Sequence, residues 1–217
     1  MKIISVNSLA IPDIKVIRFA RFCDARGYFT EQFRKSDLFN HKDLTGMRNI
    51  SFVQANQSYS RLGVIRGMHF QWNPYMGKLV RTISGHMIDL VLDIRKGSPM
   101  FGKMIAYDMP ASHSKDYDEW IWVPAGFAHG NFFKEESIIE YFCSGEYSQG
   151  CEAGISPFAQ DINWSLCDKG MKKEFEAIMP NAIITDKDKN AYSLGSWTAD
   201  KKSDNFVYSD LKNQGLF

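Results

Sequence analysis

The sequence predicts an all-β domain, built as an antiparallel sandwich or barrel with short peripheral helices. Many short segments rich in β-branched and aromatic residues are separated by closely spaced turn signals, and few stretches show a helical period. Aromatic residues favour β structure and make up 14% of the 217 residues. A chain of this length forms one domain, or one domain with an extension, and we find no internal repeat.

The composition argues against some classes of binding partner. The net charge is +1 and no basic block stands out, which argues against a nucleic-acid binder. No stretch approaches the roughly 20 apolar residues that span a bilayer, and the N-terminus lacks a signal-peptide pattern. The four cysteines form no CxxC pair, so we expect reduced thiols and a cytoplasmic protein without membrane partners.

The first elements in the chain are short. Ile14–Phe33 predicts two strands around a turn at 24–27, with Arg26 and Glu31 as charges at the ends of a solvated hairpin. A short helix is expected over Ser36–Asp43, capped by Ser36.

Polar residues alternate along Ser51–Ser60, so that Gln54 and Asn56 share one face of a predicted strand. Amide side chains there could bind a polar ligand inside a β cavity. Taken alone, the pattern favours the simpler interpretation that they face water.

Charged side chains are concentrated in Gly63–Arg81, which reads as a strand, an irregular turn at Asn73-Pro74 and a second strand. His69 lies on the first strand and Lys78 opens the second. The pair suits proton chemistry on a substrate that forms an oxyanion. An ordinary hairpin with solvated charges is the alternative, and residue types alone favour it.

A further hairpin is predicted over Leu79–Arg95, turning at Ser84-Gly85. Its second arm is almost continuously apolar, so we expect a central strand covered on both faces. Asp89 lies on this arm and needs a partner if it is buried. Ala111–Asp118 is polar and predicts a short helical turn.

Glu119–Phe133 predicts a strand, a tight turn and a strand that carries His129. Tyr141 follows inside an apolar strand, where a tyrosine is usually part of the core. Helical spacing predicts a surface helix near 168–178. On its own, the charge run at 185–189 reads as a solvated loop.

Six segments occur in an order typical of one enzyme family: DARGYFTEQF, FVQANQS, GVIRGMHFQ, GKLVR, DIRKGSPMFG and WVPAGFAHG. Together they make the chain resemble the dTDP-4-dehydrorhamnose 3,5-epimerase family, nucleotide-sugar epimerases with a cupin-type jelly roll. The resemblance covers roughly residues 10–165 and extends loosely to 192. It implies a single jelly-roll domain over 1–192, with 193–217 as a C-terminal extension.

The resemblance also implies a reaction. A base removes the hydrogen at C3 or C5 of a nucleoside-diphosphate 4-keto-6-deoxy sugar, and reprotonation of the enolate on the opposite face inverts the centre. No metal or other cofactor is implied.

Four positions match the family's catalytic residues. His69 matches the base and Asp188 the aspartate that orients it, which replaces the interpretation of 185–189 as a solvated loop. Lys78 matches the lysine that stabilises the enolate oxygen, and Tyr141 matches the acid on the opposite face.

Other positions match contacts to the sugar, the diphosphate or the nucleotide, and the family implies a homodimer in which the partner subunit can supply some of them. Tyr147, Tyr28 or Phe29 could stack on the base. The remaining matched contacts are Arg26, Glu31, Gln54, Asn56, Arg66 and His129.

The chain departs from the family pattern at several positions. Asn131 follows GFAHG where an aromatic residue is common, and Met76 stands where a glutamine is expected. These departures leave other substrates open, such as a deoxyheptose or a dideoxyhexulose, and inversion at C3 or C5 only. The fold also accommodates metal-dependent cupins and non-catalytic sugar-binding proteins.

Overall fold

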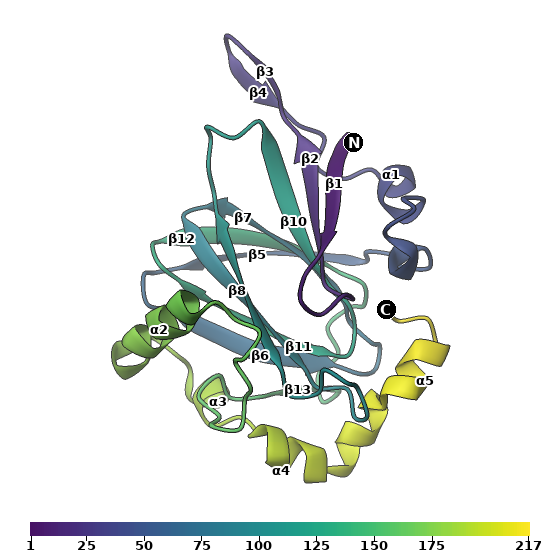
Figure 1. Cartoon of the computed structure of the whole chain (residues 1–217), viewed down its shortest axis with the longest axis vertical. Helices are drawn as coiled ribbons and strands as arrows, with labels where there is room; N and C mark the ends of the chain where they lie inside the picture. Colours follow the sequence, from purple (N-terminus) through teal and green to yellow (C-terminus); the bar gives the residue numbers. More distant parts are fainter.

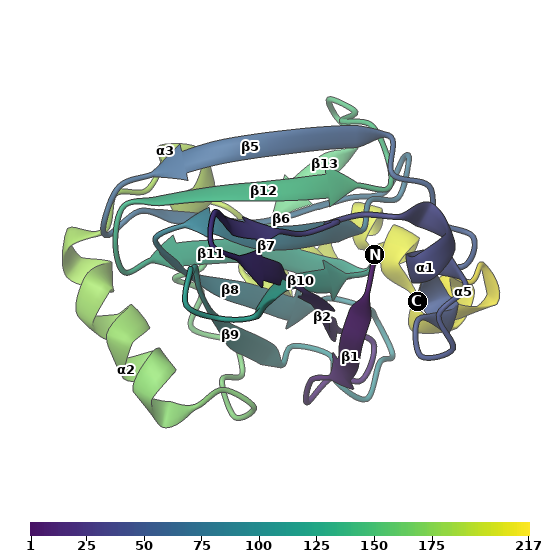
Figure 2. The same cartoon turned by 90° about the horizontal axis from the view of Figure 1, so that it is seen from above.

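The computed structural model describes residues 1–217 as two facing β-sheets with short helices around them (Figures 1 and 2). The prediction of an all-β fold with peripheral helices is confirmed. None of the helices combines the length and the apolar character needed to cross a bilayer.

The strands are distributed over two large sheets and one small hairpin. In spatial order, the six-stranded sheet contains β1 (Ile3–Ser8), β2 (Lys15–Ala20), β10 (Tyr117–Val123), β7 (Lys78–Ser84), β12 (Ser137–Cys143) and β5 (Gln54–Ser60). The five-stranded sheet contains β13 (Glu152–Gly154), β6 (Ile65–Gln71), β11 (Phe127–Phe133), β8 (His86–Asp93) and β9 (Met104–Pro110). The hairpin contains β3 (Phe22–Asp24) and β4 (Gly27–Phe29).

Most consecutive strands from β5 onward lie in opposite sheets, and only β8 and β9 form a hydrogen-bonded hairpin. The hairpin predicted over Leu79–Arg95 is therefore wrong as a pairing, since β7 pairs with β10 and β12 while β8 pairs with β11 and β9. The same holds for β6 and β7, so the turn between His69 and Lys78 crosses from one sheet to the other.

The crossing at Gly85 shows why the hairpin does not form. Gly85 has a positive φ of 81°, and its carbonyl accepts a hydrogen bond from the backbone N–H of Ala111. The next residue, His86, donates its backbone N–H to Ser137 Oγ. The backbone at the turn is therefore satisfied by other parts of the chain, and the strand direction changes between sheets.

The core lies between the two sheets. One cluster joins Val80 and Ile139 of the six-stranded sheet to Met87 and Val91 of the five-stranded sheet. Seven of the eight residues of β8 are buried, as expected for a strand covered on both faces.

Helices and 3-10 turns fill the connections and the C-terminal region. Their bounds are α1 (Lys35–Phe39), η1 (Thr45–Met47), α2 (Lys169–Ile178), η2 (Met179–Asn181), α3 (Asp186–Lys189), α4 (Leu194–Ala199), η3 (Lys201–Phe206) and α5 (Tyr208–Asn213).

Two helix predictions need correction. The helix predicted over Ser36–Asp43 is shorter and starts earlier, so Ser36 lies inside it and does not cap it. Residues 111–118 form no helical turn, because strand β10 begins at Tyr117. By contrast, the predicted helix near 168–178 is present, and Asp168 caps it by accepting hydrogen bonds from the backbone of Gly170 and Met171.

The β3–β4 hairpin extends beyond the two sheets (Figure 1). Its turn lies at 24–27, as the sequence predicts. Phe22 is 50% exposed and Phe29 is 69% exposed, so the hairpin presents aromatic surface that this chain does not cover.

The C-terminal residues wrap around the end of the molecule opposite α2 (Figures 1 and 2). Trp197 and Phe206 are fully buried, with the Trp197 ring 4.7 Å from that of Phe70 on β6. The tail also holds the crossing between β6 and β7, where the Tyr75 hydroxyl donates to the carbonyl of Asn205 at 2.7 Å. The Tyr75 ring packs edge-on against Phe206.

Candidate active site

A cavity of about 350 Å³ opens between the two sheets and is bordered by α3. Strands β5, β7 and β12 line it from one sheet, and β6 and β11 line it from the other. Most of the residues that line it are polar or charged. Its side chains include Ser58, Arg66, His69, Lys78, His129, Asn131, Tyr141, Lys187 and Asp188.

His69 and Asp188 form a dyad at the cavity wall. His69 Nε2 lies 2.7 Å from Asp188 Oδ1, and the backbone N–H of Gly67 donates to the other carboxylate oxygen. Burial alone raises the pKa of Asp188, but the hydrogen bond and charge of His69 outweigh it and hold this pKa below its usual value. The carboxylate thus stays anionic, orients the ring and leaves Nδ1 free to accept a proton.

Tyr141 faces the cavity from the opposite sheet. It lies on β12, whereas His69 lies on β6, so a ligand between the sheets has one residue on each side. Burial raises the pKa of the Tyr141 hydroxyl, which keeps it protonated at neutral pH and able to donate.

Lys78 begins β7 and faces the same cavity without a hydrogen bond or ion pair to any side chain. Burial lowers the pKa of its ammonium, although nearby Cys143 and Asp89 partly offset this effect. A buried cation without a partner is a strong partner for an oxygen that gains negative charge.

Two more cationic or ionisable groups line the cavity. His129 Nε2 lies 2.7 Å from Asp89 Oδ2, so one oxygen of the buried Asp89 carboxylate has a partner, whereas Oδ1 has none. The Arg66 guanidinium bonds Ser60 Oγ and the Tyr59 carbonyl but no carboxylate, so its charge remains available to an anion.

A second cavity of about 180 Å³ adjoins the first, since His69, Lys78 and Tyr141 line both. Gln54 and Asn56 point into it from β5, so they face a cavity and not bulk water. The Gln54 side chain accepts a hydrogen bond from the backbone N–H of Tyr147. Tyr147 is 56% exposed and lies at the rim.

Arg26 and Glu31 lie outside both cavities. The Arg26 side chain is 90% exposed at the tip of the β3–β4 hairpin and pairs with Asp24. Glu31 binds the N-terminal ammonium and Arg34. Within one chain the structure therefore separates these two predicted contacts from the others.

Sequence reasoning missed Glu152 and Lys187, which meet at the cavity rim. Glu152 Oε1 accepts hydrogen bonds from Lys187 Nζ at 2.9 Å and from the Tyr147 hydroxyl at 3.0 Å. Lys187 could have been suspected because it precedes Asp188, but no local pattern marks Glu152. Only the pairing of β13 with β6 brings it close to His69.

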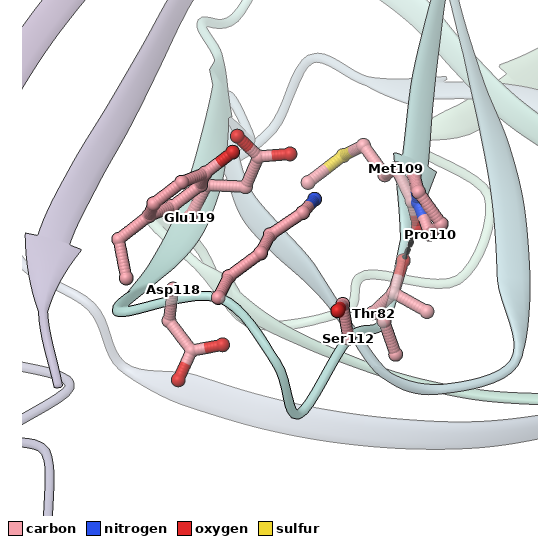
Figure 3. A pocket seen from close by; sticks show the side chains of 9 residues that line it. Thr82, Met109, Pro110, Ser112, Asp118 and Glu119 are labelled. Atoms are coloured by element: carbon pink, nitrogen blue, oxygen red, sulfur yellow. Dashed lines mark hydrogen bonds between the residues drawn. The ribbon is translucent and has the colours of Figure 1, made fainter. Parts of the chain in front are cut away.

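Another pocket, shown in Figure 3, lies next to Thr82, Met109 and Glu119 and has a volume of only about 20 Å³. This is room for little more than a water molecule. Its carboxylates are already engaged, since Glu119 pairs with Arg18 and Asp118 with Arg21. We therefore do not assign it a function.

No cluster of three or more His, Cys, Asp or Glu side chains is arranged to hold a metal ion. That the reaction needs no metal or other cofactor stays a prediction.

Comparison with protein families gives a match over residues 8–196 to the family described as dTDP-4-dehydrorhamnose 3,5-epimerase. A protein of that name from Sinorhizobium fredii is 36% identical over 180 residues, which are 81% of this chain and 88% of its own. Its counterpart from Shigella flexneri is 36% identical over 188 residues, covering 86% and 93%.

Solved structures similar to this chain come from the same family of epimerases. The dTDP-4-dehydrorhamnose 3,5-epimerase of Sulfolobus tokodaii is 34% identical and superposes with a TM-score of 0.70, covering 90% of this chain and 97% of its own. A dTDP-6-deoxy-D-glucose-3,5-epimerase of Legionella pneumophila, in complex with dTDP-4-keto-L-rhamnose, is 28% identical with a TM-score of 0.71. That match covers 88% of this chain and 93% of the other.

Proposed function

Because the chain belongs to the dTDP-4-dehydrorhamnose 3,5-epimerase family, we propose that it inverts C3 and C5 of a nucleoside-diphosphate 4-keto-6-deoxy sugar. The protein is an isomerase with the cupin jelly-roll fold of that family. One observation carries the proposal: His69 with Asp188, and Tyr141, face one cavity from opposite sheets, with the unpaired cation of Lys78 beside them.

The reaction begins at a carbon next to the C4 ketone. His69 Nδ1 takes the proton from that carbon, and the electron pair of the C–H bond moves to form an enolate with its charge on the C4 oxygen. Asp188 stabilises the imidazolium that results, and the Lys78 ammonium stabilises the oxyanion. The enolate is planar at the reacting carbon, so either face can receive the next proton.

Tyr141 then donates its hydroxyl proton to the face opposite His69, and the C4 ketone re-forms. The configuration at the carbon is inverted, and both side chains exchange protons with water to restore their starting states. The raised pKa of Tyr141 suits this role because the group must carry its proton until the enolate has formed.

Cationic side chains at the cavity can bind the diphosphate of the substrate. Arg66 has no carboxylate partner, and a guanidinium binds two phosphate oxygens at once. Gln54, Asn56 and the exposed ring of Tyr147 surround the adjoining cavity, which we assign to the nucleotide. We assign His129 as a sugar contact, because it lines the same cavity as His69.

We further propose a homodimer in which the β3–β4 hairpin of each chain reaches the cavity of its partner. This arrangement gives Arg26 and Glu31 a substrate to contact, which they lack within one chain. It also covers the exposed rings of Phe22 and Phe29.

Two smaller proposals complete this assignment. The catalytic domain comprises 1–192, and 193–217 form an extension docked on it, since its buried side chains pack onto the five-stranded sheet. The protein acts in the cytoplasm, and its four unpaired cysteines suit a reducing compartment.

The test follows hydrogen exchange in D2O by NMR, with dTDP- and GDP-linked 4-keto-6-deoxy sugars. Deuterium entering at both C3 and C5 supports the proposal, and the preferred nucleotide identifies the carrier. Exchange at one carbon alone restricts the activity to a single centre. Folded protein that exchanges neither hydrogen contradicts the proposed substrate class.

A further inference from the structure

Gln71 ends strand β6 two residues after His69, and it is only 4% exposed. Its side chain makes three hydrogen bonds to the backbone, each at 2.9 Å. Nε2 donates to the carbonyls of Pro74 and Glu146, and Oε1 accepts from the N–H of Ser148. Gln71 borders the adjoining cavity, yet both its donors and its oxygen are already engaged. This favours a role in holding the chain over a role in contacting a ligand.

Two of these bonds hold the residues on either side of Tyr147, namely Glu146 and Ser148. A planar amide presents a donor and an acceptor next to one another, so Gln71 pairs with this stretch much as a neighbouring strand would. The N–H of Tyr147 itself donates to Gln54 Oε1 at 2.8 Å, from the other sheet. Two glutamines on opposite sheets therefore hold three consecutive residues.

The Tyr147 loop, residues 144–151, has little other support. It connects β12 to β13, and none of its residues joins the hydrophobic clusters of the core. Backbone hydrogen bonds to the turn between β6 and β7 and to β6 fix its ends at Ser144 and Cys151, but most of its middle is exposed. Because no apolar side chain anchors the middle, its position depends on polar bonds such as those of Gln71.

The third bond of Gln71, to Pro74, reaches the crossing between β6 and β7, which has other supports. The C-terminal tail holds this crossing through both the hydroxyl and the ring of Tyr75. Without Gln71, the crossing and the Lys78 that follows it thus keep an anchor, whereas the middle of the Tyr147 loop loses its buried one.

We propose that Gln71 is a positioning residue that fixes the Tyr147 loop and thereby sets the affinity for the nucleotide part of the substrate. This inference rests on the proposed function, which assigns the adjoining cavity to the nucleotide, and deepens it. A ring that is held in place before binding avoids the cost of ordering the loop around the ligand. Gln71 therefore acts on nucleotide binding through Tyr147, and not on proton transfer at His69.

The experiment measures the Kd of dTDP and of GDP by isothermal titration calorimetry, and the kcat of deuterium exchange by NMR. Gln71→Met keeps the size of the side chain and removes all three bonds. We expect it to raise the Kd of the nucleotide that the wild-type protein prefers by roughly 5- to 30-fold. KM should rise in parallel, while kcat at saturating substrate stays within about threefold. A general structural defect would not produce this split.

A double-mutant cycle with Tyr147→Ala tests whether the effect passes through the tyrosine ring. In the Tyr147→Ala protein, Gln71→Met should change the nucleotide Kd by about twofold or less, so that the two substitutions are strongly non-additive.

Tyr75→Phe is the matched control, because it removes a hydrogen bond of the same crossing without touching the Tyr147 loop. Its nucleotide Kd should stay within about twofold of the wild-type value. Circular dichroism and thermal unfolding establish that each variant is folded. Gln71→Ala replaces Gln71→Met if the latter does not fold, since water can then reach the freed backbone groups.

Three results overturn the inference while the epimerase function stands: wild-type nucleotide affinity in folded Gln71→Met, an equal effect with and without the Tyr147 ring, or a loss of kcat at unchanged Kd. Wild-type protein that binds neither nucleotide and exchanges neither C3 nor C5 hydrogen overturns the proposed function itself. The two failures are distinguishable because nucleotide binding is measured without turnover.

Discussion

Replacing Asp188 by asparagine removes the charge that supports the proposed base. The amide keeps the shape of the side chain and can still accept a hydrogen bond from His69 Nε2, which now lies 2.7 Å from the carboxylate. The substitution removes the negative charge that stabilises the protonated ring during the reaction, and the amide NH2 group cannot accept the hydrogen bond that the backbone N–H of Gly67 donates to Oδ2.

The geometry sets the size of the effect. Two unit charges 2.7 Å apart attract by about 6 kcal/mol at an effective dielectric constant of roughly 20, which is an upper limit. The His69 side chain is 38% exposed, so water screens part of this attraction. Hydrogen bonds to charged groups contribute about 1.5–3 kcal/mol in measured cases. We expect kcat to fall by roughly 10- to 150-fold, with a small change in KM.

The assay is the rate of deuterium entry at C3 and C5 under saturating substrate. Asp89→Asn is the matched control, because Asp89 holds His129 at the same 2.7 Å in the same cavity. If His69 is the base, Asp89→Asn should affect kcat less than Asp188→Asn does. A folded Asp188→Asn enzyme within threefold of the wild-type kcat, or a larger loss in Asp89→Asn, would refute the assignment of the base.

Three further changes test other parts of the site. Burial lowers the pKa of Lys78 below its ordinary 10.5. At pH values below the lowered pKa, the buried ammonium therefore destabilises the folded state, and this destabilisation disappears as the pH rises to 10.5. Lys78→Met should thus abolish exchange yet raise Tm by several degrees at neutral pH in thermal unfolding, with a smaller gain at alkaline pH; a lower Tm contradicts this reasoning. Tyr141→Phe should slow formation of the inverted sugar by about 100-fold or more while His69 still exchanges the C–H hydrogen, as NMR in D2O can follow. Equal loss of exchange and inversion argues against Tyr141 as the acid. Arg26→Ala should raise KM about tenfold without changing the dimer mass in light scattering, and monomeric wild-type protein contradicts the dimer.

Local sequence patterns predicted most strands but not their partners. The alternation of β5 and the apolar run of β8 were readable because they depend on which faces are buried. The hairpin at Ser84-Gly85 was wrong because a turn signal marks a change of direction and does not say which sheet the next strand joins. The Ser36 cap failed for a similar reason, since several residues near Arg34 could begin the helix.

The sequence likewise predicted only part of the candidate site. Residue types alone left His69 and Lys78 as a possible pair, and the family resemblance supplied Tyr141 and Asp188; the structure brings all four to one cavity. Glu152 could not be found from sequence because its position depends on how β13 pairs with β6. Asn131 was visible as a departure from the family pattern, but its unsatisfied oxygen is a property of the folded chain.

The docking of the C-terminal tail has a consequence for the order in which the enzyme matures. The crossing from His69 to Lys78 is held through Tyr75 by Asn205 and Phe206, which are synthesised after all the strands of both sheets. Because a nascent chain begins to fold from its N-terminal end, both sheets can assemble while these residues are still inside the ribosome. A chain terminated before residue 205 would contain every group of the proposed mechanism and still lack the packing that holds its base and its cation together.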